Sequence, residues 1–182
     1  VLLEQDLKEA LLLRQFSISF QPQMTIATGA LYGFEALIRW RHPVRGMVPP
    51  DEFIPVLEQS RQIVPLGYWI IEQCMQQCLA LLHSGWHQFR IAINLSAEQF
   101  VDPELIPTLK RLLDKYELQG SYFELELTER TLVQSIETML NTMSQIKAMG
   151  IHFAIDDFGT GYSSLSYLKK MPMDCIKIDK SF

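Results

Sequence analysis

The chain has 182 residues, of which 48% are hydrophobic and 20% charged, a composition typical of one globular domain with a sizeable core. The formal net charge of −5 argues against broad binding to DNA or RNA, because such binding needs a basic surface. A nucleotide held by a few residues and a metal stays compatible with this charge. Three cysteines at no disulfide-like spacing favour a reducing compartment.

Short β-rich runs alternate with longer helical patterns along the chain. Strands are predicted at 17–24, 31–40, 90–95, 122–127, 152–156 and 175–178. Helices are predicted at 51–62, 66–83, 103–116, 132–149 and 163–169. This alternation indicates an α/β fold with a parallel sheet, either doubly wound or closed into a barrel. The runs RIAINL and FELEL alternate apolar and polar residues, which favours a barrel with one packed interior.

The sequence contains no apolar run long enough to span a bilayer and no signal peptide. Its first residue is Val rather than Met, so we expect an excised cytoplasmic domain. The parent protein would then be either soluble or membrane-anchored.

Polar and charged side chains gather at or just past the predicted strand ends. They are Glu35, Asn94, Glu126, Glu129, Asp156, Asp157, Lys177 and Asp179. In parallel α/β folds the carboxyl ends of the strands converge on one face. Carboxylates that meet there repel one another unless a cation balances them, and oxygen ligands suit Mg²⁺ or Mn²⁺. A single acid of this kind is more often a solvated strand end or a helix cap, but their occurrence on successive units indicates a metal site.

The Asp156–Asp157 doublet helps to supply the charge that two ions a few ångströms apart require. Such an ion pair activates water for in-line attack on a phosphodiester. Lys177 would orient that water or offset phosphate charge, and Arg39 follows Glu35 closely enough to face the same site. The next run, GTGYSS, resembles a phosphate loop only loosely, since it lacks the lysine of a Walker motif.

Four segments resemble the EAL domains, a family of bacterial cyclic di-GMP phosphodiesterases. They are FQPQMTIATGALYGFEALIRWRHP, with the signature Glu35-Ala36-Leu37, then INLSAEQF, FELELTE and IDDFGTGYSSLSYLKKMPMDCIKIDKSF. The resemblance runs through essentially the whole chain, and the last segment is long and specific.

The resemblance implies a set of ligands for one divalent metal ion, Mg²⁺ or Mn²⁺. This set is Glu35, Asn94, Glu126 and Asp156. Asp156 would bridge to a second ion, which Asp157 helps to bind. Lys177 would contact the nucleophilic water, and Asp179 is a further active-site acid.

The resemblance also implies contacts to the substrate and to partners. Gln21, Leu37 and Arg39 would contact cyclic di-GMP, with Arg39 at a phosphate. Glu129 would anchor the DDFGTGYSS loop, which couples metal binding to dimerisation in family members. A homodimer and a sensory or GGDEF-type domain in the parent protein are therefore expected.

The fold that the resemblance implies is a TIM-like barrel whose first strand is antiparallel. Six strands are predicted, whereas a closed barrel of this type needs eight. We therefore expect residues 1–182 to form a single EAL domain that lacks its C-terminal portion. In the family, that portion carries the glutamate that acts as general base.

The function expected of the parent domain is metal-dependent hydrolysis of cyclic di-GMP to linear pGpG. The alternative is a cyclic di-GMP receptor or regulatory module without turnover, and the missing C-terminal portion favours it for the chain alone, which we expect to hydrolyse poorly. A third hypothesis, an unrelated metal-dependent barrel enzyme, fits the acids but leaves the EALIRW and DDFGTGYSS segments to coincidence.

Overall fold

The computed structural model describes residues 2–128, 131, 136–159, 170–179 and 181. Its helices are α1 (Leu2–Ala10), α2 (Pro50–Gln59), α3 (Ile63–His83), α4 (Ala97–Phe100), α5 (Leu105–Tyr116) and α6 (Ile136–Ala148), with a 3-10 turn at Gly120–Tyr122. Its strands are β1 (Phe16–Met24), β2 (Leu31–His42), β3 (Gly46–Val48), β4 (Ile91–Leu95), β5 (Phe123–Thr128), β6 (His152–Phe158) and β7 (Cys175–Ile178). Within these described residues, no helix combines the length and the apolar character that a membrane crossing needs.

The strands form one mixed sheet in the order β1-β2-β4-β5-β6-β7, with β3 paired to β2. β1 runs antiparallel to β2, whereas β2, β4, β5, β6 and β7 are parallel to one another. In the described part of the chain, β1 and β7 are the two edges, so the sheet is open. The prediction of an α/β fold with an antiparallel first strand on an unclosed, mostly parallel sheet is confirmed.

Every predicted strand forms, and β2 continues to His42 because its last residues pair with β3. The helix predicted at 51–62 ends early, at Gln59, because the next residue, Ser60, turns its hydroxyl back onto the Val56 carbonyl and Arg61 takes a left-handed conformation. The predicted helix 132–149 is described from Ile136 onward, and the predicted helix 163–169 lies outside the described residues. The elements α1, β3 and α4 were not predicted.

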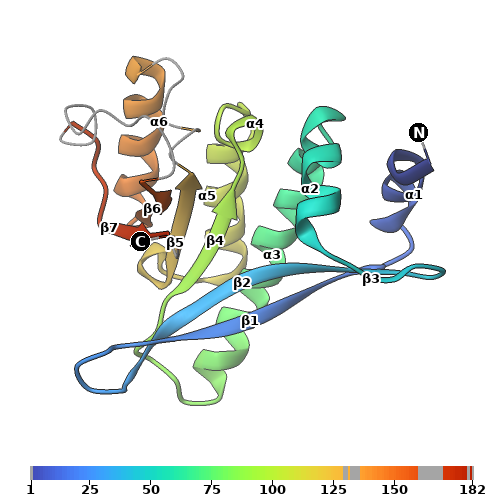
Figure 1. Ribbon diagram of the computed structural model, residues 1–182. Coiled ribbons are helices and arrows are strands. Elements are labelled where there is room, and N and C mark those ends of the chain that lie inside the picture. The colour runs from blue at the N-terminus through green and yellow to red at the C-terminus, as the bar shows by residue number, and fades with distance from the viewer. Residues whose placement is uncertain (1, 129–130, 132–135, 160–169, 180, 182) are drawn as a thin grey trace.

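The helices α3 and α5 lie behind β2, β4 and β5, and α1 lies beside α2 at the β3 end of the long β1–β2 hairpin (Figure 1). This arrangement follows from the amphipathic helices, which bury one apolar face against the sheet. The polar side chains of these strands then lie on the other face of the sheet, the face that the helices do not cover.

The buried apolar side chains form two clusters. The larger cluster joins α3, α5 and α6 to the parallel strands and includes Ala36 of β2. The smaller cluster packs α1 and α2 around Trp40 of β2, which is fully buried. The Trp40 indole Nε1 donates to Gln15 Oε1 at 3.0 Å, so its polar atom is also satisfied. β2 is therefore held at its two halves by two different cores.

The strand register places polar residues beside one another at the carboxyl edge of the sheet. Gln21 lies opposite Glu35 in the antiparallel pair, and opposed residues project to the same face. Asn94 of β4 is the register partner of Glu126 of β5, and Thr128 is the partner of Asp156. One edge therefore collects side chains from five different strands.

Gly33 marks a close approach between β2 and β4. A Cβ atom at Gly33 would lie 2.4 Å from the Arg90 carbonyl oxygen, which accepts a hydrogen bond from the Phe34 amide. We expect Gly33→Ala to lower the free energy of unfolding, measured by urea denaturation, by about 2 kcal/mol, because the strands must separate. Ser17→Ala, at an exposed position of β1, is the control and should change it by less than about 0.5 kcal/mol. Equal stability of both variants and the unchanged chain would contradict the close approach.

Candidate metal centre and its pocket

Side chains from five neighbouring strands meet at the carboxyl edge of the sheet. They are Glu35 of β2, Asn94 of β4, Glu126 of β5, Asp156 of β6 and Lys177 of β7. Parallel strands bring their carboxyl ends to the same edge, which is why residues far apart in the sequence become neighbours here. The structure brings these five residues together, as the sequence analysis expected.

The three carboxylates of Glu35, Glu126 and Asp156 each place one oxygen within 4.8 Å of the others. Lys177 lies among them, with its Nζ 2.6 Å from Glu126 Oε2, 3.2 Å from Glu35 Oε2 and 3.4 Å from Asp156 Oδ1. The Asn94 amide Nδ2 donates to Glu35 Oε1 at 3.1 Å. The orientation of these side chains is therefore fixed by contacts among themselves.

Glu126 is the most deeply buried acid of this cluster, with 1% of its surface exposed. Burial raises its pKa to about 7, with Glu35 and Asp156 adding to the rise and Lys177 acting in the opposite direction. Its Oε1 atom is buried without a hydrogen-bond partner among the described residues. A buried carboxylate oxygen without a donor is costly, and a divalent cation is the kind of group that would satisfy it. The donor set of this cluster therefore fits Mg²⁺ or Mn²⁺.

Lys177 carries the only ammonium group in contact with the cluster among the described residues. Burial by itself would lower the pKa of Lys177, but the hydrogen bond to Glu126 and the charges of Asp156 and Glu35 raise it above its usual value. Lys177 thus stays protonated near neutral pH. Such a group donates hydrogen bonds and offsets negative charge, but it does not accept a proton.

Asp156 belongs to the acidic cluster and Asp157 lines the adjoining cavity, although adjacent residues on a regular strand face opposite sides. The pairing of β6 with β7 shifts register between Ile155 and Phe158, and Asp157 adopts a left-handed conformation with φ 52°. Burial and the neighbouring Asp156 carboxylate raise the pKa of Asp157. A strand bulge therefore turns an adjacent pair into two acids on one face.

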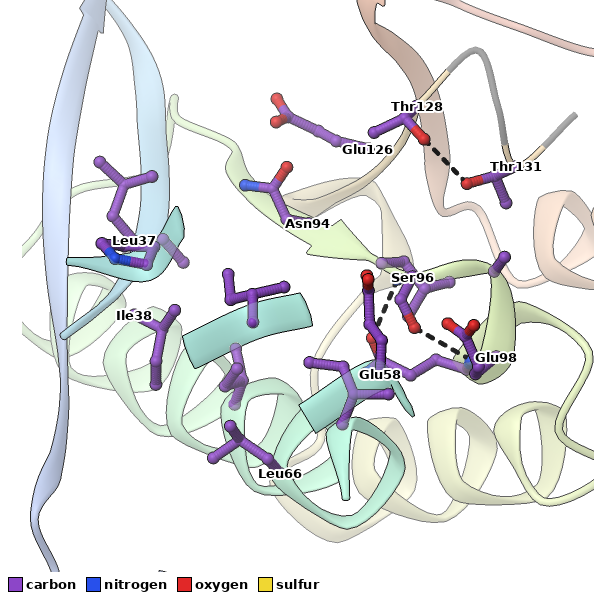
Figure 2. A pocket seen from close by; sticks show the side chains of 18 of the residues that line it. Leu37, Ile38, Glu58, Leu66, Asn94, Ser96, Glu98, Glu126, Thr128 and Thr131 are labelled. Carbon is purple, nitrogen blue, oxygen red and sulfur yellow. Dashed lines mark hydrogen bonds between the residues drawn. The ribbon is translucent and has the colours of Figure 1, made fainter. Parts of the chain in front are cut away.

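A cavity of about 630 Å³ opens beside the cluster. Asn94, Glu126 and Asp157 line one end, next to the metal candidates. Figure 2 shows the remaining lining, which continues between the end of β2 and the helices α2 and α3 to Leu66. This second region includes Leu37, Ile38 and Arg39, which follow Ala36, the last residue of β2 that pairs with β4.

Two of the three predicted substrate contacts line the same cavity. Leu37 and Arg39 line it, and the Arg39 guanidinium donates to the Ile38 carbonyl at 3.0 Å. Gln21 lies opposite Glu35 and is exposed. Leu37 and Arg39 thus share a cavity with Glu126, Gln21 is paired with Glu35, and the role of all three as substrate contacts stays a prediction.

Two further predicted residues lie at the margin of the site. Asp179 follows β7, accepts from the Ser181 amide at 2.8 Å, and contributes to the raised pKa of Asp157. Glu129 and residues 160–164 of the predicted DDFGTGYSS loop lie outside the described residues, so the loop-anchoring role stays a prediction.

The sequence analysis did not identify Glu58 and Glu98, which line the second region of the cavity. Both are partly buried, and Figure 2 draws them with Ser96 on the same side of the cavity. A signal was available for Glu58, because it lies in the last turn of α2, where a negative charge opposes the helix dipole.

The raised pKa of Glu126 predicts a pH-dependent stability for the metal-free protein. The folded state holds the Glu126 proton up to about pH 7, whereas the unfolded chain releases it near its ordinary pKa of 4.5. The free energy of unfolding should therefore fall as pH rises from about 5 to about 8, by roughly 2–3 kcal/mol. Glu126→Gln should flatten this dependence in urea denaturation in EDTA. An unchanged slope in the variant would show that another group is responsible.

The left-handed backbone at Asp157 gives a second prediction. Glycine adopts this conformation without the steric cost that a Cβ atom imposes. In EDTA, Asp157→Gly should therefore be more stable than Asp157→Ala by about 1 kcal/mol in urea denaturation. Neither variant carries the carboxylate, so their comparison isolates the backbone. Equal stabilities would argue against the bulge.

Comparison with known proteins gives a consistent match. The family model of the EAL domain matches residues 4–182. The bifunctional diguanylate cyclase/cyclic di-GMP phosphodiesterase MucR of Pseudomonas aeruginosa is 40% identical over 177 residues, which are 97% of this chain and 26% of that protein. The cyclic di-GMP phosphodiesterase PdeR of Escherichia coli is 39% identical over 180 residues, 99% of this chain and 27% of that protein.

A solved structure of the PaMucR phosphodiesterase in complex with c-di-GMP is also similar. It matches with a TM-score of 0.95 at 39% identity and covers 100% of this chain and 73% of its own. The chain thus spans about a quarter of the length of these curated relatives. The family model covers nearly every residue, and Glu35, the first residue of the family signature Glu35-Ala36-Leu37, belongs to the acidic cluster. The chain belongs to the EAL domain family.

Proposed function

We propose that the protein hydrolyses cyclic di-GMP to linear pGpG with the help of two divalent metal ions. The observation that carries this proposal is the cluster of Glu35, Glu126 and Asp156 around one lysine, at the end of a cavity, in a chain of the EAL family. The names of MucR and PdeR, both phosphodiesterases of cyclic di-GMP, support the substrate. The complex of the PaMucR phosphodiesterase with c-di-GMP supports it as well.

The proposed ligands of the first ion are Glu35, Asn94, Glu126 and Asp156. The Asn94 Nδ2 donates to Glu35, which leaves its amide oxygen to face a cation. Glu126 offers its unpartnered Oε1. Asp156 would be shared with the second ion, and Asp157, turned to the same face by the bulge, would complete the second site. Mg²⁺ or Mn²⁺ bound there would lower the pKa of a water and stabilise the leaving oxygen.

Lys177 would orient the attacking water and offset charge on the phosphate. Its raised pKa keeps it cationic, so its part is electrostatic and a different group must accept the proton of the water. Asp179, whose charge reaches Asp157, would be a further acid of the active site.

Three residues would contact the substrate directly. Arg39 would bind a phosphate, because a guanidinium matches phosphate geometry with two hydrogen bonds. Leu37 would pack against the ligand from the cavity wall. Gln21, on the face that Glu35 shares, would hydrogen-bond to it from β1.

The family also suggests an assembly. The chain covers only 26% of MucR, whose name includes a diguanylate cyclase, so a GGDEF-type or sensory domain in the same protein fits the proposal. We place the domain in the cytoplasm, where its three cysteines would stay reduced. A homodimer through the DDFGTGYSS region, with Glu129 as the anchor of that loop, is part of the same proposal.

The proposal is tested by incubating protein that carries this chain with cyclic di-GMP and Mg²⁺, Mn²⁺ or EDTA. Formation of pGpG should require a divalent ion, and Glu35→Ala should reduce the rate by at least about a hundredfold, because a direct ligand is lost. Product is followed by chromatography.

The matched control is Glu52→Ala. Glu52 is an exposed glutamate on α2 that pairs with Arg45 at 2.6 Å, away from the cluster, and its loss should leave the rate within about twofold. Binding of cyclic di-GMP is measured in parallel. Tight binding without any product would replace the enzyme by a receptor, and absence of both would exclude cyclic di-GMP as the ligand.

A further inference from the structure

We propose that Asp174 is a positioning residue that holds Lys177 in the acidic cluster by fixing the register of β7 on β6. This inference rests on the proposed function, in which Lys177 orients the attacking water and offsets phosphate charge. Asp174 precedes β7 directly and lies three residues before Lys177, so it acts through the strand and not at the reacting atoms.

β7 is a short strand at the edge of the described sheet (Figure 1). It has four residues, and in the described part of the chain it pairs only with β6. Its alternate side chains, Ile176 and Ile178, are 49% and 71% exposed, so their burial holds the strand only weakly. The pairing is regular at Ile176 but shifts register before Ile178. The register of β7 is therefore set at its amino end.

The register of β7 decides where the Lys177 ammonium lies. In the native register its Nζ is 2.6 Å from Glu126 Oε2 and 3.4 Å from Asp156 Oδ1. Because successive residues of a strand face opposite sides, a slip by one residue would turn Lys177 away from these acids. A slip by two residues would restore the face but move the lysine roughly 7 Å along the strand. Either slip would remove the ammonium from the cluster.

Asp174 forms two hydrogen bonds with Phe153 that define this register. The Asp174 amide donates to the Phe153 carbonyl at 2.9 Å, and Asp174 Oδ2 accepts from the Phe153 amide at 2.8 Å. One residue thus satisfies both main-chain groups of its partner. Phe153 is fully buried, so a slip of β7 would take the acceptor away from a buried amide. The two bonds therefore favour one register over its neighbours.

The Asp174 carboxylate is itself held by two basic side chains. Lys147, in the last turn of α6, donates to both carboxylate oxygens at 2.6 and 2.8 Å. His152 Nδ1 lies 3.5 Å from Oδ1, and an Arg90 nitrogen lies 3.2 Å from His152 Nε2. A guanidinium only donates, so Nε2 accepts and the neutral ring carries its proton on Nδ1, toward Asp174. Burial alone would raise the pKa of Asp174, but the hydrogen bonds from Lys147 and Phe153 lower it, so the carboxylate stays ionised.

Arg90 extends these contacts to the strands that carry the acids. It precedes β4 directly and also donates to Glu124 of β5 at 3.2 Å, while His152 is the first residue of β6. Asp174 is thereby tied to β4, β5 and β6, the strands that supply three of the four proposed ligands of the first ion. The position of Lys177 is therefore set relative to the strands whose acids it balances.

The test measures cyclic di-GMP hydrolysis at varied substrate concentration in Mg²⁺, with protein that carries this chain. Asp174→Ala should lower kcat at least about tenfold, because a displaced ammonium no longer stabilises the reacting charge. KM should stay within about threefold, since Leu37 and Arg39 come from β2, which pairs with β1 and β4 and not with β7. Asp174→Asn should recover kcat to within about threefold of the unchanged protein, because its amide oxygen can still accept from Phe153.

The matched control is Glu72→Ala. Glu72 joins α3 to α5 by accepting from Lys115 at 2.7 Å and from Tyr116 at 3.0 Å. Its side chain is 32% exposed, against 28% for Asp174, so both substitutions remove a carboxylate that connects two elements at similar burial. Glu72→Ala should leave kcat within about twofold. An equal loss of kcat in both variants would assign the effect to general stability and overturn the inference.

A double-mutant cycle tests whether Asp174 acts through Lys177. Lys177→Ala removes the ammonium, so adding Asp174→Ala to it should lower kcat by less than about twofold further. A further loss of about tenfold in this background would show that Asp174 acts by another route, and the inference would be wrong.

Hydrogen exchange gives a readout that needs no turnover. In EDTA, Asp174→Ala should speed the exchange of the main-chain amides of β7 by at least about tenfold, while those of β4 and β5 stay within about twofold. Unchanged exchange of β7 would overturn the inference, whatever the kinetics show. Faster exchange with an unchanged kcat would make Asp174 a purely structural residue and overturn it as well.

Failure of the inference is distinct from failure of the proposed function. If the unchanged protein forms pGpG and Asp174→Ala does so with the same kcat, the inference fails and the proposed function stands. A raised KM with an unchanged kcat has the same meaning. If the unchanged protein forms no product, the proposed function and the inference fall together.

Discussion

The mutual repulsion of three carboxylates is the constraint on which this structure depends. Glu35, Glu126 and Asp156 come from three strands and lie within 4.8 Å of one another, and Lys177 of a fourth strand is the cation that separates them. The acids are therefore balanced only after β7 has paired with β6 in its native register. The edge of the sheet and the acidic cluster therefore depend on the same strand, because β7 completes the described sheet and also supplies Lys177, which compensates the charge of the cluster.

The two glutamates of β5 differ in their hydrogen bonding. Glu124 and Glu126 are two residues apart and share a face, and both are buried. At the amino end of the strand, Arg90 donates to Glu124 at 3.2 Å and to the Tyr32 hydroxyl at 2.8 Å. These hydrogen bonds join side chains of the protein itself. At the carboxyl end, Glu126 keeps one buried oxygen without a donor. Only the second arrangement leaves an acceptor for a ligand, which agrees with the general placement of sites at the carboxyl ends of parallel strands.

Much of this architecture could be predicted from the sequence because it depends on patterns of a few residues. Alternating strands such as FELEL and the acids at their ends indicate both the sheet and the convergence of Glu35 and Glu126. The bulge at Asp157 could not be predicted, since a left-handed residue within a strand has no periodic signal and aspartate only tolerates this conformation. Glu58 was missed because its neighbours in space, such as Ser96, come from a later unit of the chain. The short β3 and α4 fall below the length at which periodicity is informative.

Because the interior is divided into two cores, the two halves of β2 are held by different neighbours. Pairing with β4 ends at Ala36, which belongs to the larger core together with the strands that carry the acids. Beyond that point β2 stays paired with β1 as far as Trp40, whose side chain packs in the smaller core with α1 and α2 and donates to Gln15. Leu37 and Arg39 lie between these two anchors. The β1–β2 hairpin and the smaller core therefore position Leu37 and Arg39, whereas the parallel strands and the larger core position Glu126 and Asp156.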